Sequence, residues 1–101
     1  MINVIASIKV KSDKIKEFLT IFKANVPAVK KEKGCIEYFP SMDFDSGLSA
    51  QKKDSNIVTI IEKWESIEDL KDHLKSSHMD SYREKVKDIV ESVELKILEE
   101  A

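Results

Sequence analysis

The segment IVTIIEKW, residues 57–64, decides the fold of this chain. It is rich in β-branched residues and largely apolar on both faces of an extended backbone, which is typical of a central strand that is covered on both sides. Helices can cover one face of the sheet that holds this strand. Another copy of the same sheet is the simplest cover for the second face, so the segment also predicts a homodimer.

Three further strands are predicted on either side of this segment. Residues 2–11 alternate between apolar and polar positions and predict a half-buried strand. Residues 35–42 predict a second strand, and the alternation over 93–97 predicts a last one. The stretch between residues 43 and 56 is polar and rich in Ser and Asp, so we expect a long hairpin connection with a short strand around 48–51.

The first helix is predicted from apolar residues at three- and four-residue steps between Ile15 and Val29. Ser12 or Asp13 is expected to cap its N-terminus, and Gly34 supplies the left-handed residue that stops it. Pro27 lies inside this helix and should kink it near Asn25, because proline removes one backbone hydrogen bond.

A second helical region follows the central strand. Ser66 is its predicted N-cap, and the pair Ser76-Ser77 is expected to break or kink it. Its buried residues should be Ile67, Leu70 and Leu74 before the break, and Met79, Tyr82, Val86 and Ile89 after it. The element order is therefore β-α-β-β-α-β, which predicts one α+β domain over residues 1–101 with a ferredoxin-like antiparallel sheet. Two such sheets facing one another would form a dimeric α+β barrel.

Composition excludes several classes of protein. The 101 residues suffice for a single core, and 17 Lys+Arg against 19 Asp+Glu give a net charge of −2, so nothing favours a nucleic-acid partner. The lone Cys35 cannot form an intrachain disulfide. The first residues lack a basic leader and a cleavage site, and no apolar run approaches membrane-spanning length. We therefore expect a cytoplasmic protein without membrane insertion.

No phosphate loop, nucleophile elbow or metalloprotease motif is present, so the candidates for chemistry are individual polar residues. Glu62 is the first of them. It shares a strand face with residues that are predicted to be buried. A carboxylate in that place is paired, holds a proton at a raised pKa, or lies exposed at a sheet edge. A salt bridge to Lys9 or Lys96 on a neighbouring strand is the structural alternative.

His73 and His78 are the only histidines and lie in the same helical region. Histidine titrates near neutrality and is the usual general base, so the pair suggests proton transfer. The structural alternative is that His73 packs at the helix–sheet boundary and His78 caps a helix end. We expect no metal site, because no Asp or Glu completes a recognisable ligand set at matching spacing.

Three more polar or aromatic residues are weaker candidates for binding. Asn25 stands near the predicted kink, where free backbone groups compete for its side chain. Tyr38 either offers its hydroxyl to a cavity or packs as a core aromatic residue. Trp64, at the end of the central strand, is more often a core residue than a catalytic one.

Three motifs together resemble the antibiotic-biosynthesis monooxygenase superfamily, and within it the bacterial quinol monooxygenases of the YgiN type. They are GCxxY from Gly34, IExWESI from Ile61 and HLxxxHM from His73. The resemblance covers essentially the whole chain, including the Val26-Pro27 pair inside the first helix. It is fairly specific to the superfamily but does not specify the reaction.

The resemblance implies a dimeric barrel with a cavity in each protomer. It also implies oxygenation without metal, haem or flavin, with O2 as co-substrate and a small aromatic quinol as substrate. A deprotonated quinol can itself reduce O2, so the protein need only bind it in a dry cavity, take its proton and stabilise the anion. On this hypothesis His73 is the base or proton relay, with His78 or Glu62 as its partner. Tyr38, Trp64 and Asn25 would line the cavity or orient the substrate.

Other activities of this superfamily remain alternatives. Haem-degrading relatives use a Trp and a later His after the central strand, whereas Asp72 and Tyr82 stand near those positions here, which argues against haem. An isomerase of a small phosphorylated sugar would want a strongly basic pocket, and Arg83 is the only arginine, so we rank it below the oxygenase. A barrel that binds a small apolar ligand without catalysis, in a structural or stress-related role, is the non-enzymatic alternative.

Overall fold

Seven elements follow one another along the chain in the computed structural model, which describes residues 1–101. They are β1 (Ile2–Val10), α1 (Ile15–Lys30), β2 (Cys35–Ser41), β3 (Ile57–Trp64), α2 (Ile67–Leu74), α3 (Ser77–Val86) and β4 (Val90–Leu98). The predicted β-α-β-β-α-β order is confirmed, with the second helical region divided into α2 and α3 at the Ser76-Ser77 pair. The chain thus has the expected ferredoxin-like α+β fold.

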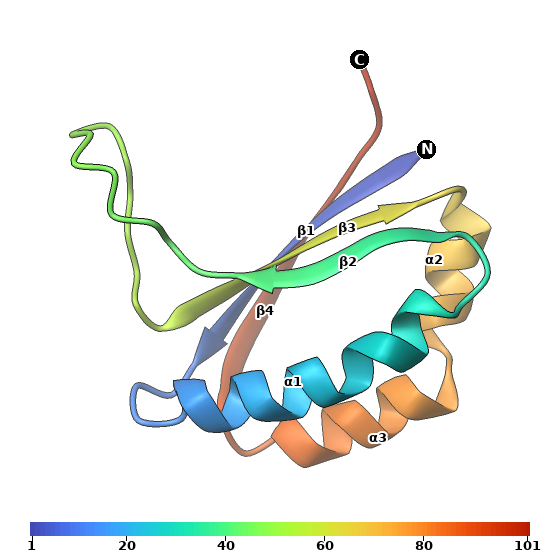
Figure 1. Ribbon diagram of the computed structural model, residues 1–101, viewed down its shortest axis with the longest axis horizontal. Helices are drawn as coiled ribbons and strands as arrows, with labels where there is room; N and C mark the ends of the chain where they lie inside the picture. Colours follow the sequence, from blue (N-terminus) through green and yellow to red (C-terminus); the bar gives the residue numbers. More distant parts are fainter.

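The four strands form one antiparallel sheet in the order β2-β3-β1-β4. β3 lies between two neighbours, as its apolar sequence predicts. Its residues alternate in burial, and Val58, Ile60, Glu62 and Trp64 form the buried face. Figure 1 shows α1 and α3 side by side along one face of the sheet, with α2 at one end. The opposite face of the sheet is covered by no helix of this chain.

The core lies between the sheet and the two long helices. Phe18, Phe22 and Val29 of α1 are buried, and so are Met79 and Tyr82 of α3, as the helical spacing predicts. The aromatic rings are in direct contact. The Phe22 ring stacks on Tyr38 of β2 with centroids 5.4 Å apart and meets the edge of Tyr82 at 5.7 Å. This cluster joins both helices to the sheet next to the candidate residues Glu62 and His73.

Two predictions about helix α1 and the β2–β3 connection are wrong. Neither Ser12 nor Asp13 caps α1, because the helix begins at Ile15 and the N-cap position, Lys14, makes no side-chain cap. No strand forms around residues 48–51. The connection instead satisfies its own polar groups, for example through Gln51, which donates to the carbonyl of Phe44. It extends away from the sheet as a long arm (Figure 1).

The buried face of α2 differs from the predicted stripe by one position. Ser66 caps the helix as expected, because its hydroxyl accepts a hydrogen bond from the Asp69 backbone amide. Leu74, however, is 38% exposed, whereas His73 is 1% exposed. A polar ring therefore occupies the core position that the sequence assigned to a leucine.

The helices are all short or interrupted by charged residues, and none is long and apolar enough to cross a membrane.

Candidate functional site

A cavity of about 400 Å³ lies between the sheet and helix α3. Its walls are largely apolar and include Ala6, Ile8, Phe22, Ile60, Met79 and Val86. Three of the sequence-predicted site residues, Tyr38, Glu62 and His73, also line it. A cavity of this size and composition suits a small aromatic molecule, with a few polar groups that fix its orientation.

Glu62 is a nearly buried carboxyl group in this cavity wall. It is 7% exposed, and its Oε1 accepts a hydrogen bond of 3.0 Å from the indole Nε1 of Trp64. The suggested salt bridges are absent, because Lys9 pairs with Asp54 and Lys96 lies opposite Ile5 on the other face of the sheet. Burial raises the pKa of Glu62 to about 7, although the Trp64 hydrogen bond lowers it. Glu62 can therefore take up or release a proton near neutral pH.

His73 is enclosed between two aromatic rings. The Trp64 ring lies 4.7 Å from it, centroid to centroid, and the Tyr38 ring 5.4 Å from it in an edge arrangement. Burial lowers the pKa of His73, so the imidazole is neutral at physiological pH. His73 Nδ1 lies 2.8 Å from Glu32 Oε2. His73 thus packs at the helix–sheet boundary, as the structural alternative expects, and in addition contacts the Glu32 carboxylate.

The Glu32 carboxylate fixes the tautomer of His73. A carboxylate only accepts hydrogen bonds, so the proton of the neutral ring is on Nδ1 and the lone pair is on Nε2. Glu32 does not line the cavity, whereas His73 does. In this tautomer Nε2 is the ring nitrogen that can accept a proton from a molecule in the cavity. A neutral imidazole that is oriented by a carboxylate is the arrangement of a general base.

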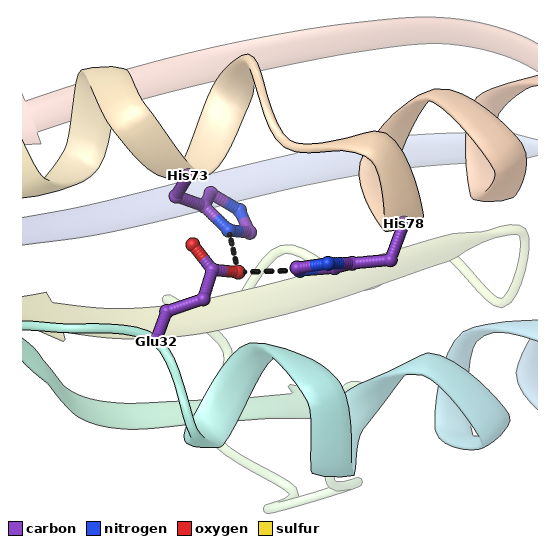
Figure 2. A group of neighbouring side chains, drawn as sticks. All are labelled: Glu32, His73 and His78. Carbon is purple, nitrogen blue, oxygen red and sulfur yellow. Dashed lines mark hydrogen bonds and ion pairs between the residues drawn. The ribbon is translucent and has the colours of Figure 1, made fainter.

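His78 contacts the same carboxylate from the other side. Its Nε2 lies 2.7 Å from Glu32 Oε2 and 3.2 Å from the hydroxyl of Ser76. Figure 2 shows Glu32 between the two imidazole rings, which come from α2 and α3. The side chain of His78 is 30% exposed and lines a separate polar groove between α1 and α3. His78 is thus joined to His73 through Glu32 and faces away from the apolar cavity.

Glu32 is the residue that the sequence analysis missed. It lies in the lysine-rich turn after α1, 41 residues before His73 and 46 before His78. The sequence analysis expected no Asp or Glu to complete a ligand set with the histidines at matching spacing, whereas the fold brings the distant Glu32 to both rings. The local signal was the GCxxY motif, which begins two residues after Glu32 and fixes the turn that carries it.

Gly34 places this turn against helix α2. Its φ of +81° is in the left-handed region, and a Cβ at this position would lie 2.1 Å from Asp69 Oδ2. Only glycine permits the turn to approach the first turn of α2 this closely. Because His73 follows Asp69 by four residues on the same face of the helix, this approach also brings Glu32 to His73.

The remaining predicted residues have distinct places. Trp64 is fully buried behind Glu62 and His73, so it orients both. Asn25 does not line the apolar cavity: it lines the polar groove, and its amide Nδ2 donates to Met79 Sδ at 3.4 Å. The backbone carbonyls near Pro27 therefore do not engage this side chain. Burial raises the pKa of Tyr38 far above its usual range, so its hydroxyl keeps its proton.

Comparison with known proteins finds relatives of this chain. Residues 1–85 match the family model described as antibiotic biosynthesis monooxygenase. The chain is 38% identical over 101 residues to the protein of Escherichia coli K12 named "Probable quinol monooxygenase YgiN", covering 98% of this chain and 97% of that protein. The same identity and coverage hold for the protein of that name in Shigella flexneri.

Solved structures share the fold. A conserved protein from Methanosarcina mazei Go1 superposes with a TM-score of 0.85 at 25% identity, covering 99% of this chain and 92% of that one. Rv0793 from Mycobacterium tuberculosis superposes with a TM-score of 0.82 at 21% identity, covering 99% and 94%. The family match and the full-length relatives identify this chain as a monooxygenase that belongs to the antibiotic biosynthesis monooxygenase family.

Proposed function

We propose that this protein is a cytoplasmic, cofactor-free monooxygenase that oxidises a quinol or a related phenol with O2. The observation that carries the proposal is the neutral His73, held by Glu32 at Nδ1 and lining an apolar cavity together with Glu62 and Tyr38. The name of the Escherichia coli relative supports the quinol as the substrate class.

The first step is removal of a proton from the quinol. His73 Nε2 accepts the hydroxyl proton, and the positive charge that forms on the ring is stabilised by the Glu32 carboxylate. The second quinol hydroxyl can pass its proton to Glu62, whose pKa of about 7 allows it to accept or return a proton. Apolar walls favour the step because they exclude water from the reacting anion.

The second step needs no external reductant. The quinolate transfers an electron to O2, the two radicals combine to form a C–O bond, and the O–O bond then breaks. One oxygen atom remains on the ring as a hydroxyquinone, and the other leaves as water together with two protons of the substrate. The four electrons that O2 requires come from the quinol, so atoms and electrons balance without flavin, haem or metal.

We also propose that two copies pack through the uncovered face of the sheet to form the dimeric barrel. Ile5 and Ile61 lie opposite one another in the register of that face and are only partly buried, and Phe39, paired with Ile61, is 41% exposed. A second copy would remove this apolar surface from water.

The cations of the cavity do not favour the sugar-phosphate isomerase. Arg83 and Lys87 both line it. Arg83, however, donates to Asp80 and to the carbonyl of Leu74, and Lys87 donates to Glu84. Both charges are thus already paired within α3 and its flanks, so neither is preset to bind a phosphate.

Oxygen uptake by metal-stripped protein with a panel of hydroquinones tests the proposal. We expect uptake above the autoxidation control, with one O2 consumed per quinol and incorporation of one ¹⁸O atom from ¹⁸O2 into the product. His73→Gln should lower the rate by about 10²–10⁴-fold, the usual contribution of a general base. The matched control is Asp72→Asn, at the neighbouring exposed position of α2.

The outcomes separate the candidate functions. Uptake that persists in His73→Gln would contradict the assigned base and transfer that role to Glu62. Absence of uptake with every quinol, in protein that still binds them, would contradict the monooxygenase reaction on quinols and favour the non-catalytic binding barrel. Absence of both would favour the isomerase.

A further inference from the structure

We propose that Glu32, His73 and His78 bind a divalent transition-metal ion of the zinc class, in a site behind the apolar cavity. The ligand atoms are His73 Nδ1, His78 Nε2 and a carboxylate oxygen of Glu32. These three atoms lie within 4.8 Å of one another. The site does not depend on the proposed quinol chemistry.

The directions of the two rings converge on one point. His73 Nδ1 and His78 Nε2 approach the same atom, Glu32 Oε2, at 2.8 and 2.7 Å (Figure 2). A ring nitrogen that carries no proton directs its lone pair along the direction that its N–H bond would otherwise take. Once the ring protons move to the opposite nitrogens, both lone pairs therefore meet at the place where the carboxylate now lies.

The spacing is close to that of a zinc site. In a tetrahedral site with zinc–ligand distances of about 2.0–2.2 Å, neighbouring ligand atoms are about 3.4 Å apart. The oxygen–nitrogen distances here, 2.8 and 2.7 Å, are shorter by about 0.6–0.7 Å, which a rotation of the Glu32 side chain can open. Two imidazoles and one carboxylate suit zinc, cobalt, nickel or ferrous iron.

The surroundings provide access and a fourth donor. His78 is 30% exposed and lines the polar groove between α1 and α3, so an ion can enter from solvent. The hydroxyl of Ser76 lies 3.2 Å from His78 Nε2, where it or a water molecule could complete the coordination. The positive charge of Arg83 acts on His73 and would oppose a bound cation, but this guanidinium is paired with Asp80.

The place of the ion distinguishes it from a catalytic metal. Glu32 and His78 do not line the apolar cavity, so an ion between them would lie on the far side of the His73 ring from a bound substrate. A metal at Nδ1 leaves the ring proton on Nε2, so Nε2 can no longer accept a proton from a bound molecule. If the proposed function is correct, the metal would thus convert the base into a hydrogen-bond donor and inhibit the enzyme.

Equilibrium dialysis of metal-stripped protein against Zn²⁺, followed by metal analysis, tests the site. We expect one Zn²⁺ per chain, and Co²⁺ should give visible d–d absorption bands that Zn²⁺ abolishes. Glu32→Gln and His78→Gln should weaken binding more than tenfold. These variants avoid the fully buried His73, and circular dichroism checks that they fold.

Two control variants make the test specific. Ser81→Ala changes the same groove without touching a ligand, and Cys35→Ser removes the only thiol. Both should bind Zn²⁺ as the unaltered protein does. The proposal is overturned if the folded protein binds no Zn²⁺ at tens of micromolar, or if binding survives unchanged in both Glu32→Gln and His78→Gln.

Oxygen uptake then separates the metal site from the proposed function. Inhibition by Zn²⁺ that is lost in His78→Gln would support both. Stoichiometric Zn²⁺ binding without any effect on uptake would support the metal site and contradict His73 as the base. Uptake that depends on His73 in a protein that binds no Zn²⁺ would overturn the metal site and leave the proposed function standing.

Discussion

Glu32 and His73 lie 41 residues apart in the sequence, and Glu32 Oε2 lies 2.8 Å from His73 Nδ1 in the folded protein. This bond joins the turn after α1 to helix α2 and determines which nitrogen of a fully buried imidazole carries the proton. His78 contacts the same oxygen at 2.7 Å. One carboxylate thus links a ring in the apolar cavity to a ring in the polar groove.

Replacing Glu32 by Gln should lower quinol-dependent oxygen uptake, because the amide has no charge to stabilise the imidazolium. Its NH2 group can also donate to His73 Nδ1, which would place the ring proton on Nε2 and remove the base. We expect kcat/KM to fall by roughly 10²-fold. Glu17→Gln, at an exposed position of α1, is the matched control and should change nothing. Equal rates in both variants would contradict the role of Glu32.

The buried Glu62 should make stability depend on pH. Its pKa is about 7 in the folded protein and near 4.5 in the unfolded chain, so the folded state holds an extra proton between these values. Below pH 4.5 the carboxyl is protonated in both states and costs nothing. Between pH 4.5 and 7 the unfolded chain releases this proton while the folded state keeps it, so the free energy of unfolding falls by roughly 3 kcal/mol and levels off above pH 7, where the folded state holds a desolvated charge.

Glu62→Gln isolates this effect, because its amide oxygen still accepts the Trp64 hydrogen bond. The two proteins should differ little near pH 4.5, and the variant should be the more stable at pH 8.5. Urea unfolding across this range measures the difference, in which the other titrating groups cancel. A difference that does not change with pH would contradict the raised pKa of Glu62.

Substitution of Gly34 by Ala should destabilise the protein and separate Glu32 from His73. Alanine at positive φ costs about 1–2 kcal/mol, and here its Cβ would also meet the Asp69 carboxylate. We expect a total loss of about 2–4 kcal/mol. Gly47→Ala provides the control, because Gly47 has φ of +75° but nothing within 4 Å of the added Cβ. Thermal unfolding that shifts equally in both would exclude the Asp69 contact as the cause.

The elements of this fold follow from local patterns, so the sequence predicts them well. The apolar strand at 57–64, the alternation over 2–11 and the break at Ser76-Ser77 all reflect periodicity or capping within a few residues. Two local predictions are nevertheless wrong, the N-cap of α1 and the strand around 48–51. Ser, Asp and short apolar runs favour such features only weakly, and in the connection between β2 and β3 the loop forms its own hydrogen bonds instead of a strand.

The candidate site could be predicted only in part, because it depends on contacts between distant residues. Glu62 and Tyr38 share the buried sheet face with the cavity, which strand alternation indicates. Glu32 carries no such signal, since a carboxylate among lysines after a helix is an ordinary solvated residue. Asn25 lies one helix face away from the cavity, a difference that depends on how α1 packs against α3.

The last prediction tests which of the two hollows, the apolar cavity or the polar groove, binds the substrate. Ala6 lies on β1 in the wall of the apolar cavity, and Ala24 lies on α1 in the wall of the polar groove. Ala6→Leu adds three carbon atoms to a cavity of about 400 Å³. The extra volume should raise the KM for a hydroquinone at least tenfold, because a hydrophobic pocket discriminates by about 1–3 kcal/mol per methylene. The same change at Ala24 should leave KM unaltered.

Steady-state oxygen uptake gives both values, and thermal unfolding confirms that each variant folds. A raised KM in Ala24→Leu alone would place the substrate in the polar groove beside His78, and His78 would then replace His73 as the base.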